Sequence, residues 1–72
     1  MDWKAIVGRN VRRLRQERKL SQEQLALSAG IDLTYVGGIE LGKRNPSLLI
    51  LARLATALET TPSKLIEATP SV

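Results

Sequence analysis

The stretch SQEQLALSAGIDLTYVGGIE, residues 21–40, decides the fold. Ser21 with Gln24 three residues later matches a capping box, so the sequence predicts a helix that begins at this point. Gly30 ends that helix, because glycine readily takes the left-handed conformation found at helix C-termini. Asp32 follows as the cap of another short helix.

Two short helices joined by a tight glycine turn form a helix-turn-helix. Ala26 is small where the two helices are expected to cross, and the inward residues Ile31, Val36 and Ile39 fix the second helix against the first. Such a rigid pair lets one helix lie over a DNA backbone while the next enters the major groove. We expect the motif to span about residues 21–41.

Outside this motif, the sequence predicts three more helices. Apolar residues at spacings of three and four indicate a first helix over about residues 2–18. Ser47 caps a fourth helix, and Thr61 with Pro62 begins a fifth, since proline is favoured at the first helical position. No segment alternates with a period of two over a length that would make a convincing strand. The expected fold is all-α, with a single compact five-helix domain over residues 1–68 and a short tail over residues 69–72.

Composition excludes several classes of site. The 72 residues contain no cysteine and no histidine, so a zinc site would have to use carboxylates alone. There is no glycine-rich phosphate loop and no carboxylate pair at a catalytic spacing. The sequence therefore predicts no enzyme, no metal, no cofactor and no small-molecule ligand.

The apolar residues are too scattered for a membrane protein. No run approaches the roughly 20 residues that span a bilayer, and the first residues lack the apolar stretch of a signal peptide. We expect a cytoplasmic protein without membrane contact.

Basic residues are concentrated near the N-terminus. The chain has 11 Lys and Arg against 7 Asp and Glu, and the excess is crowded over Arg9, Arg12, Arg13, Arg15, Arg18 and Lys19. This clustering favours a polyanionic partner. A solvated helix face that keeps the protein soluble would have the same charges, and charge alone does not separate the two.

Longer motifs carry a family resemblance. VGRNVRRLRQERKLSQEQLA (7–26), GID (30–32), IELGKRNPS (39–47) and LARLATAL (51–58) together resemble the Cro and phage-repressor family, also called the xenobiotic-response-element family. TYVGGIELGKRNPS (34–47) is similar to the controller proteins of restriction–modification systems. The resemblance implies a repressor-type domain, a transcriptional regulator that binds double-stranded DNA at an operator as a homodimer.

The resemblance also implies where DNA would lie. Ser21 and Gln22 would lie beside a phosphate, which the positive end of the helix dipole favours, although Ser21 could equally serve only as a cap. The recognition helix would turn outward a set of five residues, namely Leu33, Thr34, Tyr35, Gly37 and Gly38. Of these five residues, only Thr34 and Tyr35 have side chains that can hydrogen-bond a base. Because so few side chains can read bases, DNA shape would also contribute to sequence choice.

The paired glycines of this helix and the basic loop after it also bear on DNA binding. Gly37 and Gly38 would let the helix backbone approach the groove closely; alternatively, Gly38 provides clearance between helices or is merely tolerated. Lys43, Arg44 and Asn45 follow in a loop that the family's fold runs beside phosphates, where they would supply affinity rather than sequence information.

Other residues are expected to have structural roles. The positions of Arg15 and Glu40 commonly pair in relatives, and both adjoin core residues here, so we expect a partly buried ion pair, with a minor phosphate role for Arg15. Trp3 is expected to cover one end of the core.

The fourth helix is expected to carry the dimer interface. A helical wheel turns Leu48, Leu51, Leu54, Ala55 and Leu58 inward and leaves Leu49 and Ile50 outside. Relatives usually have polar residues at these two outer positions, and exposed apolar clusters commonly mark association surfaces. The expected dimer interface consists of Leu49, Ile50, Arg53, Ala57 and Ile66. Alternatively, these side chains extend a small core or meet the tail.

Two other functions compete with DNA regulation. A protein-interaction module, such as an antitoxin or an adaptor on the same fold, would explain a recognition helix with few polar residues. RNA binding is disfavoured because single-strand readers present aromatic residues for stacking, and the chain has one Trp, one Tyr and no Phe.

Overall fold

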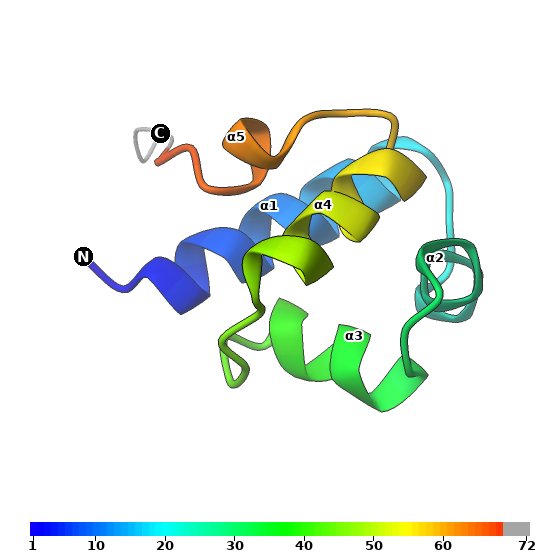
Figure 1. Ribbon diagram of the computed structural model, residues 1–72, viewed down its shortest axis with the longest axis horizontal. Coiled ribbons are helices and arrows are strands. Elements are labelled where there is room, and N and C mark those ends of the chain that lie inside the picture. The colour runs from blue at the N-terminus through cyan, green and yellow to red at the C-terminus, as the bar shows by residue number, and fades with distance from the viewer. Residues whose placement is uncertain (69–72) are drawn as a thin grey trace.

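The computed structural model describes residues 1–68 of the chain as a bundle of short helices (Figure 1). The helices are α1 (Trp3–Glu17), α2 (Gln22–Ala29), α3 (Leu33–Glu40), α4 (Leu48–Ala57) and α5 (Pro62–Leu65). The expected all-α fold is confirmed, and each expected helix is present. The expected tail, residues 69–72, lies outside the described residues.

Side-chain caps fix where α1, α2 and α4 begin. Asp2 accepts a hydrogen bond from the Ala5 N–H at 3.1 Å, and Ser47 accepts one from the Ile50 N–H at 3.2 Å. At α2 the capping box is complete, because Ser21 accepts from the Gln24 N–H at 3.0 Å while the Gln24 side chain accepts from the Ser21 N–H at 2.8 Å. These caps satisfy backbone donors that the first turn of a helix leaves unpaired.

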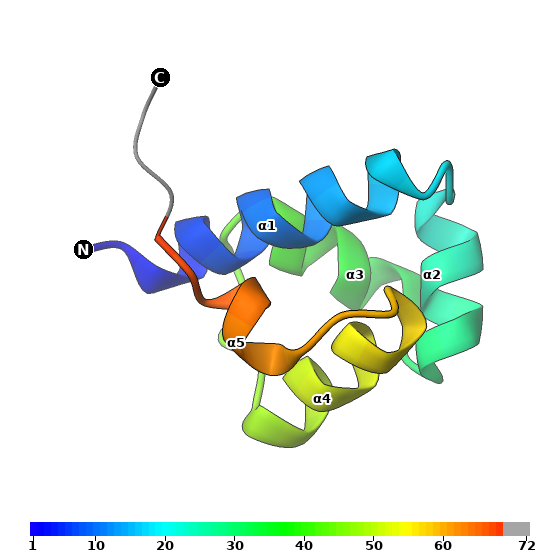
Figure 2. The ribbon, with the colours of Figure 1, turned by 90° about the horizontal axis from the view of Figure 1, so that it is seen from above.

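One apolar core joins all five helices. Its buried members are Ile6, Val7, Val11, Leu25, Ala26, Ala29, Val36, Ile39, Leu54, Ala55, Leu58 and Leu65. Helix α1 packs against α3 and α5, and α2 packs against α3 and α4. As a result α3 lies along one edge of the molecule, with α1 and α4 on the same side of it in Figure 1. Viewed from above, α5 lies beside α4 and close to α1 (Figure 2).

The orientation of α4 differs from the expectation at its first turn. Leu48, which was expected to face inward, has 75% of its surface exposed, whereas Ile50, expected outside, is half-buried against the core. A helical wheel gives the direction of a side chain around the axis, but burial also requires a neighbouring element opposite that turn. Leu49 is exposed, as expected.

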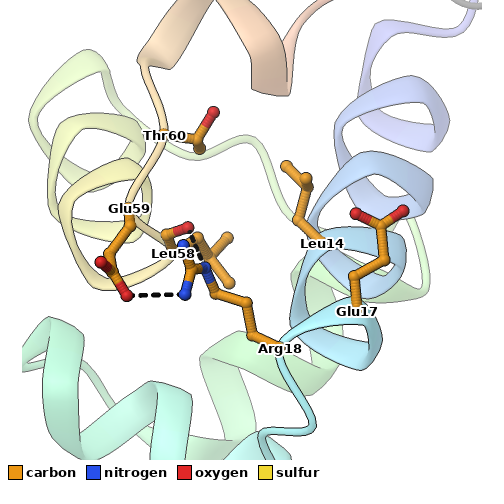
Figure 3. A pocket seen from close by; sticks show the side chains of 6 residues that line it. All are labelled: Leu14, Glu17, Arg18, Leu58, Glu59 and Thr60. Carbon is orange, nitrogen blue, oxygen red and sulfur yellow. Dashed lines mark hydrogen bonds and ion pairs between the residues drawn. The ribbon is translucent and has the colours of Figure 1, made fainter.

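A polar clamp joins the far ends of α1 and α4. Arg18 donates one hydrogen bond to the Leu58 carbonyl and pairs with Glu59, each at 2.6 Å, across a hollow that Leu14 and Glu17 also line (Figure 3). The clamp satisfies a carbonyl at the end of α4, where helices leave such groups unpaired.

Among residues 1–68, no helix is long and apolar enough to cross a membrane.

Candidate nucleic-acid interface

One side of helix α3 packs against the core, and the opposite side is exposed. Val36 and Ile39 are buried in the core, and Asp32 accepts a hydrogen bond from the Thr34 N–H at 2.8 Å to begin the helix. On the opposite side Leu33 and Thr34 are exposed. A helix that is packed on one side and exposed on the other can be inserted into a groove without rearranging the core.

An ion-pair network ties the helices around α3 together. Arg15 and Glu40 form a two-point ion pair, with Arg15 Nε 2.6 Å from Glu40 Oε2 and Nη2 3.0 Å from Oε1. Gln22 Nε2 donates to the same Oε1 at 3.1 Å, and Arg15 Nη1 donates to the Leu20 carbonyl at 2.8 Å. The network links α1, α2 and α3. The hydrogen bond to Glu40 raises the pKa of Arg15 against the opposing effect of burial.

The start of α2 offers backbone donors rather than free side chains. The Ser21 hydroxyl is engaged in the capping box, and the Gln22 amide is engaged with Glu40. The N–H groups of Gln22 and Glu23 belong to the first turn, which has no preceding helical carbonyls to bind. An anion at this end of α2 would be bound by these N–H groups and by the helix dipole.

The loop after α3 turns back along the helix. Gly42 has a φ of +73°, its N–H donates to the Ile39 carbonyl at 3.0 Å, and the Lys43 N–H donates to the Gly38 carbonyl at 2.9 Å. This is a glycine-terminated helix end. Lys43, Arg44 and Asn45 are all exposed beyond it.

The family model named helix-turn-helix matches residues 11–65, which include the α2–α3 pair and the helices that support it. The chain belongs to this helix-turn-helix family.

Several relatives of this chain are named as control proteins or as restriction–modification controller proteins. Control protein C.SmaI from Serratia marcescens is 47% identical over 66 residues, which cover 92% of this chain and 79% of the relative. The crystal structure of the controller protein C.AhdI from Aeromonas hydrophila superimposes with a TM-score of 0.84 and 47% identity, over 86% of this chain and 94% of that one.

A third relative has been solved on DNA. The controller protein C.Esp1396I, described as a tetramer in complex with its natural 35 base-pair operator, has a TM-score of 0.78 and 30% identity to this chain. The match covers 82% of this chain and 78% of that one. The resemblance to controller proteins expected from the sequence is confirmed.

Within the helix-turn-helix, the two glycines of α3 differ in their surroundings. A Cβ atom added at Gly37 would meet nothing within 4 Å, whereas one added at Gly38 would lie 2.7 Å from Arg44 Cγ. Neither glycine provides clearance between helices. That role belongs to Gly8 on α1, where an added Cβ would clash with the Ile39 carbonyl oxygen.

The expected interface residues on α4 and α5 are not equally accessible. Leu49, Arg53 and Ile66 are exposed, while Ile50 and Ala57 are half-buried against the core. Two other large apolar side chains are also exposed, namely Leu48 on α4 and Trp3 on α1. Trp3 lines a hollow together with Leu51 and Ile66 and is itself 54% exposed, so it covers that end of the core only in part.

Sequence reasoning missed one residue that shapes this surface. Asn10 is buried, and its Nδ2 donates to the Leu65 carbonyl at 2.8 Å and to the Glu67 carbonyl at 2.9 Å. These bonds fix the segment that contains Ile66. The available signal was a polar residue next to Val11, inside the apolar stripe of the first helix.

Proposed function

We propose that the chain is a sequence-specific transcriptional regulator that binds double-stranded DNA as a homodimer, with α3 in the major groove of each half of a roughly palindromic operator. The observation that carries this proposal is the geometry of α3. Its inner side is packed and its outer side presents Thr34. The first turn of α2 is bonded to the end of α3 through Gln22 and Glu40, and the basic loop that begins at Lys43 follows α3 and is bonded to Gly38. This is the arrangement by which helix-turn-helix proteins dock on DNA.

The contacts divide by chemistry. The first turn of α2, with Ser21 and Gln22, and the loop residues Lys43 and Asn45 would bind phosphates, which supply affinity and register. Thr34, and Leu33 beside it, would meet base edges, where leucine can pack on a thymine methyl. The operator that C.Esp1396I binds as a tetramer supports a DNA partner and an oligomer for this family.

The dimer would form through the outer faces of α4 and α5. Leu49 and Ile66 are exposed, and Leu48 adds a third large aliphatic side chain to this region. A two-fold axis at this surface would set two copies of α3 about one DNA turn apart, or roughly 34 Å.

Selection of bound duplexes from a random pool tests this function. We expect an enriched motif with two-fold symmetry and half-sites about one turn apart. Binding to a random duplex should weaken steeply with salt, because each neutralised phosphate releases counterions. Failure to enrich any sequence would contradict the proposal.

A protein-interaction module is the second candidate. The exposed Leu33 and the paired glycines leave α3 with few side chains that can hydrogen-bond a base. If this were the function, binding to random DNA would be weak and nearly independent of salt.

A further inference from the structure

The outer face of α3 has a gap at Gly38 that a residue from outside the helix fills. The Arg44 side chain lies against Gly38, so an added Cβ would be 2.7 Å from Arg44 Cγ and 3.1 Å from Nε. Real Cβ atoms do not approach other heavy atoms below 3.0 Å. Any side chain at position 38 would therefore displace Arg44.

The backbone brings Arg44 to this place. The Lys43 N–H donates a hydrogen bond to the Gly38 carbonyl. Arg44 is the next residue, so its backbone lies close to Gly38. Gly42 makes the necessary turn with its positive φ, and it lies against Ala5 of α1, with 3.3 Å from an added Cβ to Ala5 Cα. The loop is therefore anchored to two helices rather than free.

An aromatic ring holds the other end of the side chain. The Arg44 guanidinium carbon lies 5.6 Å from the centroid of the Tyr35 ring, within the roughly 6 Å over which a ring attracts a cation. Tyr35 and Gly38 are three residues apart and so share a helix face. Arg44 is thus fixed at its stem by Gly38 and at its head by Tyr35, while remaining exposed.

We propose that Gly38 is a specificity-determining position that acts through Arg44. The missing side chain leaves a slot in which Arg44 lies before DNA arrives, so that a loop residue takes the place of a groove-facing side chain of α3. This assigns Arg44 to base reading, in place of the sequence-independent phosphate contact expected from its loop position. Arginine suits that role because its guanidinium can donate two hydrogen bonds to guanine. The inference rests on the proposed DNA-binding function.

Gly37 provides a matched control. It belongs to the same helix and adjoins Gly38, but an added Cβ there has no neighbour within 4 Å. Alanine favours helix more than glycine does. Neither Gly37→Ala nor Gly38→Ala should therefore unfold α3, and only the second should move Arg44.

The first measurement uses the free protein and does not depend on DNA. Proton NMR should detect contacts between the Arg44 side chain and the Tyr35 ring in the parent and in Gly37→Ala. We expect Gly38→Ala to lose these contacts and the upfield ring-current shift of the Arg44 side-chain protons. Their persistence in Gly38→Ala would overturn the proposed positioning, even if the protein proves not to bind DNA.

The second measurement uses a duplex selected from the random pool and a random duplex. Arg44→Ala and Gly38→Ala should each weaken binding to the selected duplex about tenfold, with less loss on random DNA. The double variant should be no weaker than Arg44→Ala, because Gly38 acts only through that side chain. Equal losses on both duplexes, or a further loss in the double variant, would overturn the proposal. If the parent selects no duplex, the DNA-binding function fails, while the NMR result still decides the positioning of Arg44.

Discussion

Glu40 is the most tightly engaged charge of the structure's ion pairs. Its side chain is 4% exposed and accepts hydrogen bonds from both Arg15 and Gln22. A buried carboxylate of this kind depends on its partners, because loss of one partner leaves a charge without solvent. The surface pair of Arg13 with Glu17, at 3.6 Å, has no such dependence.

Glu40→Ala should therefore lower stability strongly, because it leaves the Arg15 guanidinium without its partner. Removing one member of a buried pair costs about 3–5 kcal/mol, and less where water enters. The control Glu17→Ala breaks an exposed pair worth about 0.3–0.5 kcal/mol. Urea unfolding compares the two, and similar losses would show that the Glu40 pair is not a buried one.

The difference in stability between the parent and Glu40→Ala depends on pH through Arg15. Its pKa is raised in the folded protein by the hydrogen bond to Glu40. A group with a raised folded-state pKa stabilises fully at pH values below its unfolded pKa and loses the effect only as pH rises through the folded value. The gap between the parent and Glu40→Ala should thus stay constant from about pH 7 to pH 10.

Thr34 should influence sequence choice. It is exposed at the start of α3, and its hydroxyl is available to a base edge. Thr34→Ala should change the preference at one operator position by about 1–3 kcal/mol. Lys43→Ala is the contrasting variant, since loss of a phosphate contact weakens all duplexes alike and lowers the salt slope by about one. An unchanged selected motif for Thr34→Ala would contradict this.

At the scale of the element, glycine has opposite roles at the middle and at the end of α3. Gly37 lies within the helix beside open space, whereas Gly42 ends it with a φ of +73° and an added Cβ 3.3 Å from Ala5 Cα. Only the second position requires glycine for backbone reasons. The end of α3, and with it the path of the basic loop, depends on that residue.

Substitution by alanine should change the free energy of unfolding in opposite directions at these two positions. Gly42→Ala should destabilise by about 1–2 kcal/mol, the cost of placing a side chain in the left-handed region. Gly37→Ala should stabilise by up to about 1 kcal/mol through helix propensity. Thermal unfolding of both variants measures the difference, and a shift of the same sign in both would refute it.

For the whole molecule, the exposed apolar face of α4 is the feature that a monomer does not require. Leu48 and Leu49 are 75% and 62% exposed, and Ile66, directly after α5, is 45% exposed. Ile50 is a poorer probe of this surface, because it also packs against the core and its replacement would disturb folding.

Leu49→Glu should convert the proposed dimer into a folded monomer, since a carboxylate would be buried in the interface. Leu27→Glu is the matched control, because Leu27 is 86% exposed but lies on α2. Analytical ultracentrifugation at micromolar concentration distinguishes the species. A monomeric parent, or a dimeric Leu49→Glu variant, would rule out this interface.

The sequence by itself determined where α1, α2, α3 and α4 begin. Asp2, Ser21, Asp32 and Ser47 are local signals, since each side chain caps a backbone group two or three residues away. Gly30 likewise marked the turn through its own left-handed conformation. Such contacts span a few residues, so they are present in the sequence pattern before any tertiary packing exists.

Only the tertiary structure decided the rest of the surface. Leu48, Leu49, Ile50 and Leu51 form an unbroken apolar run, and such a run does not fix which side of a helix faces the core. The slot at Gly38 was also hidden, because its occupant comes from a loop that returns to the helix only after Gly42. These features depend on tertiary contacts between separate segments, which local periodicity does not encode.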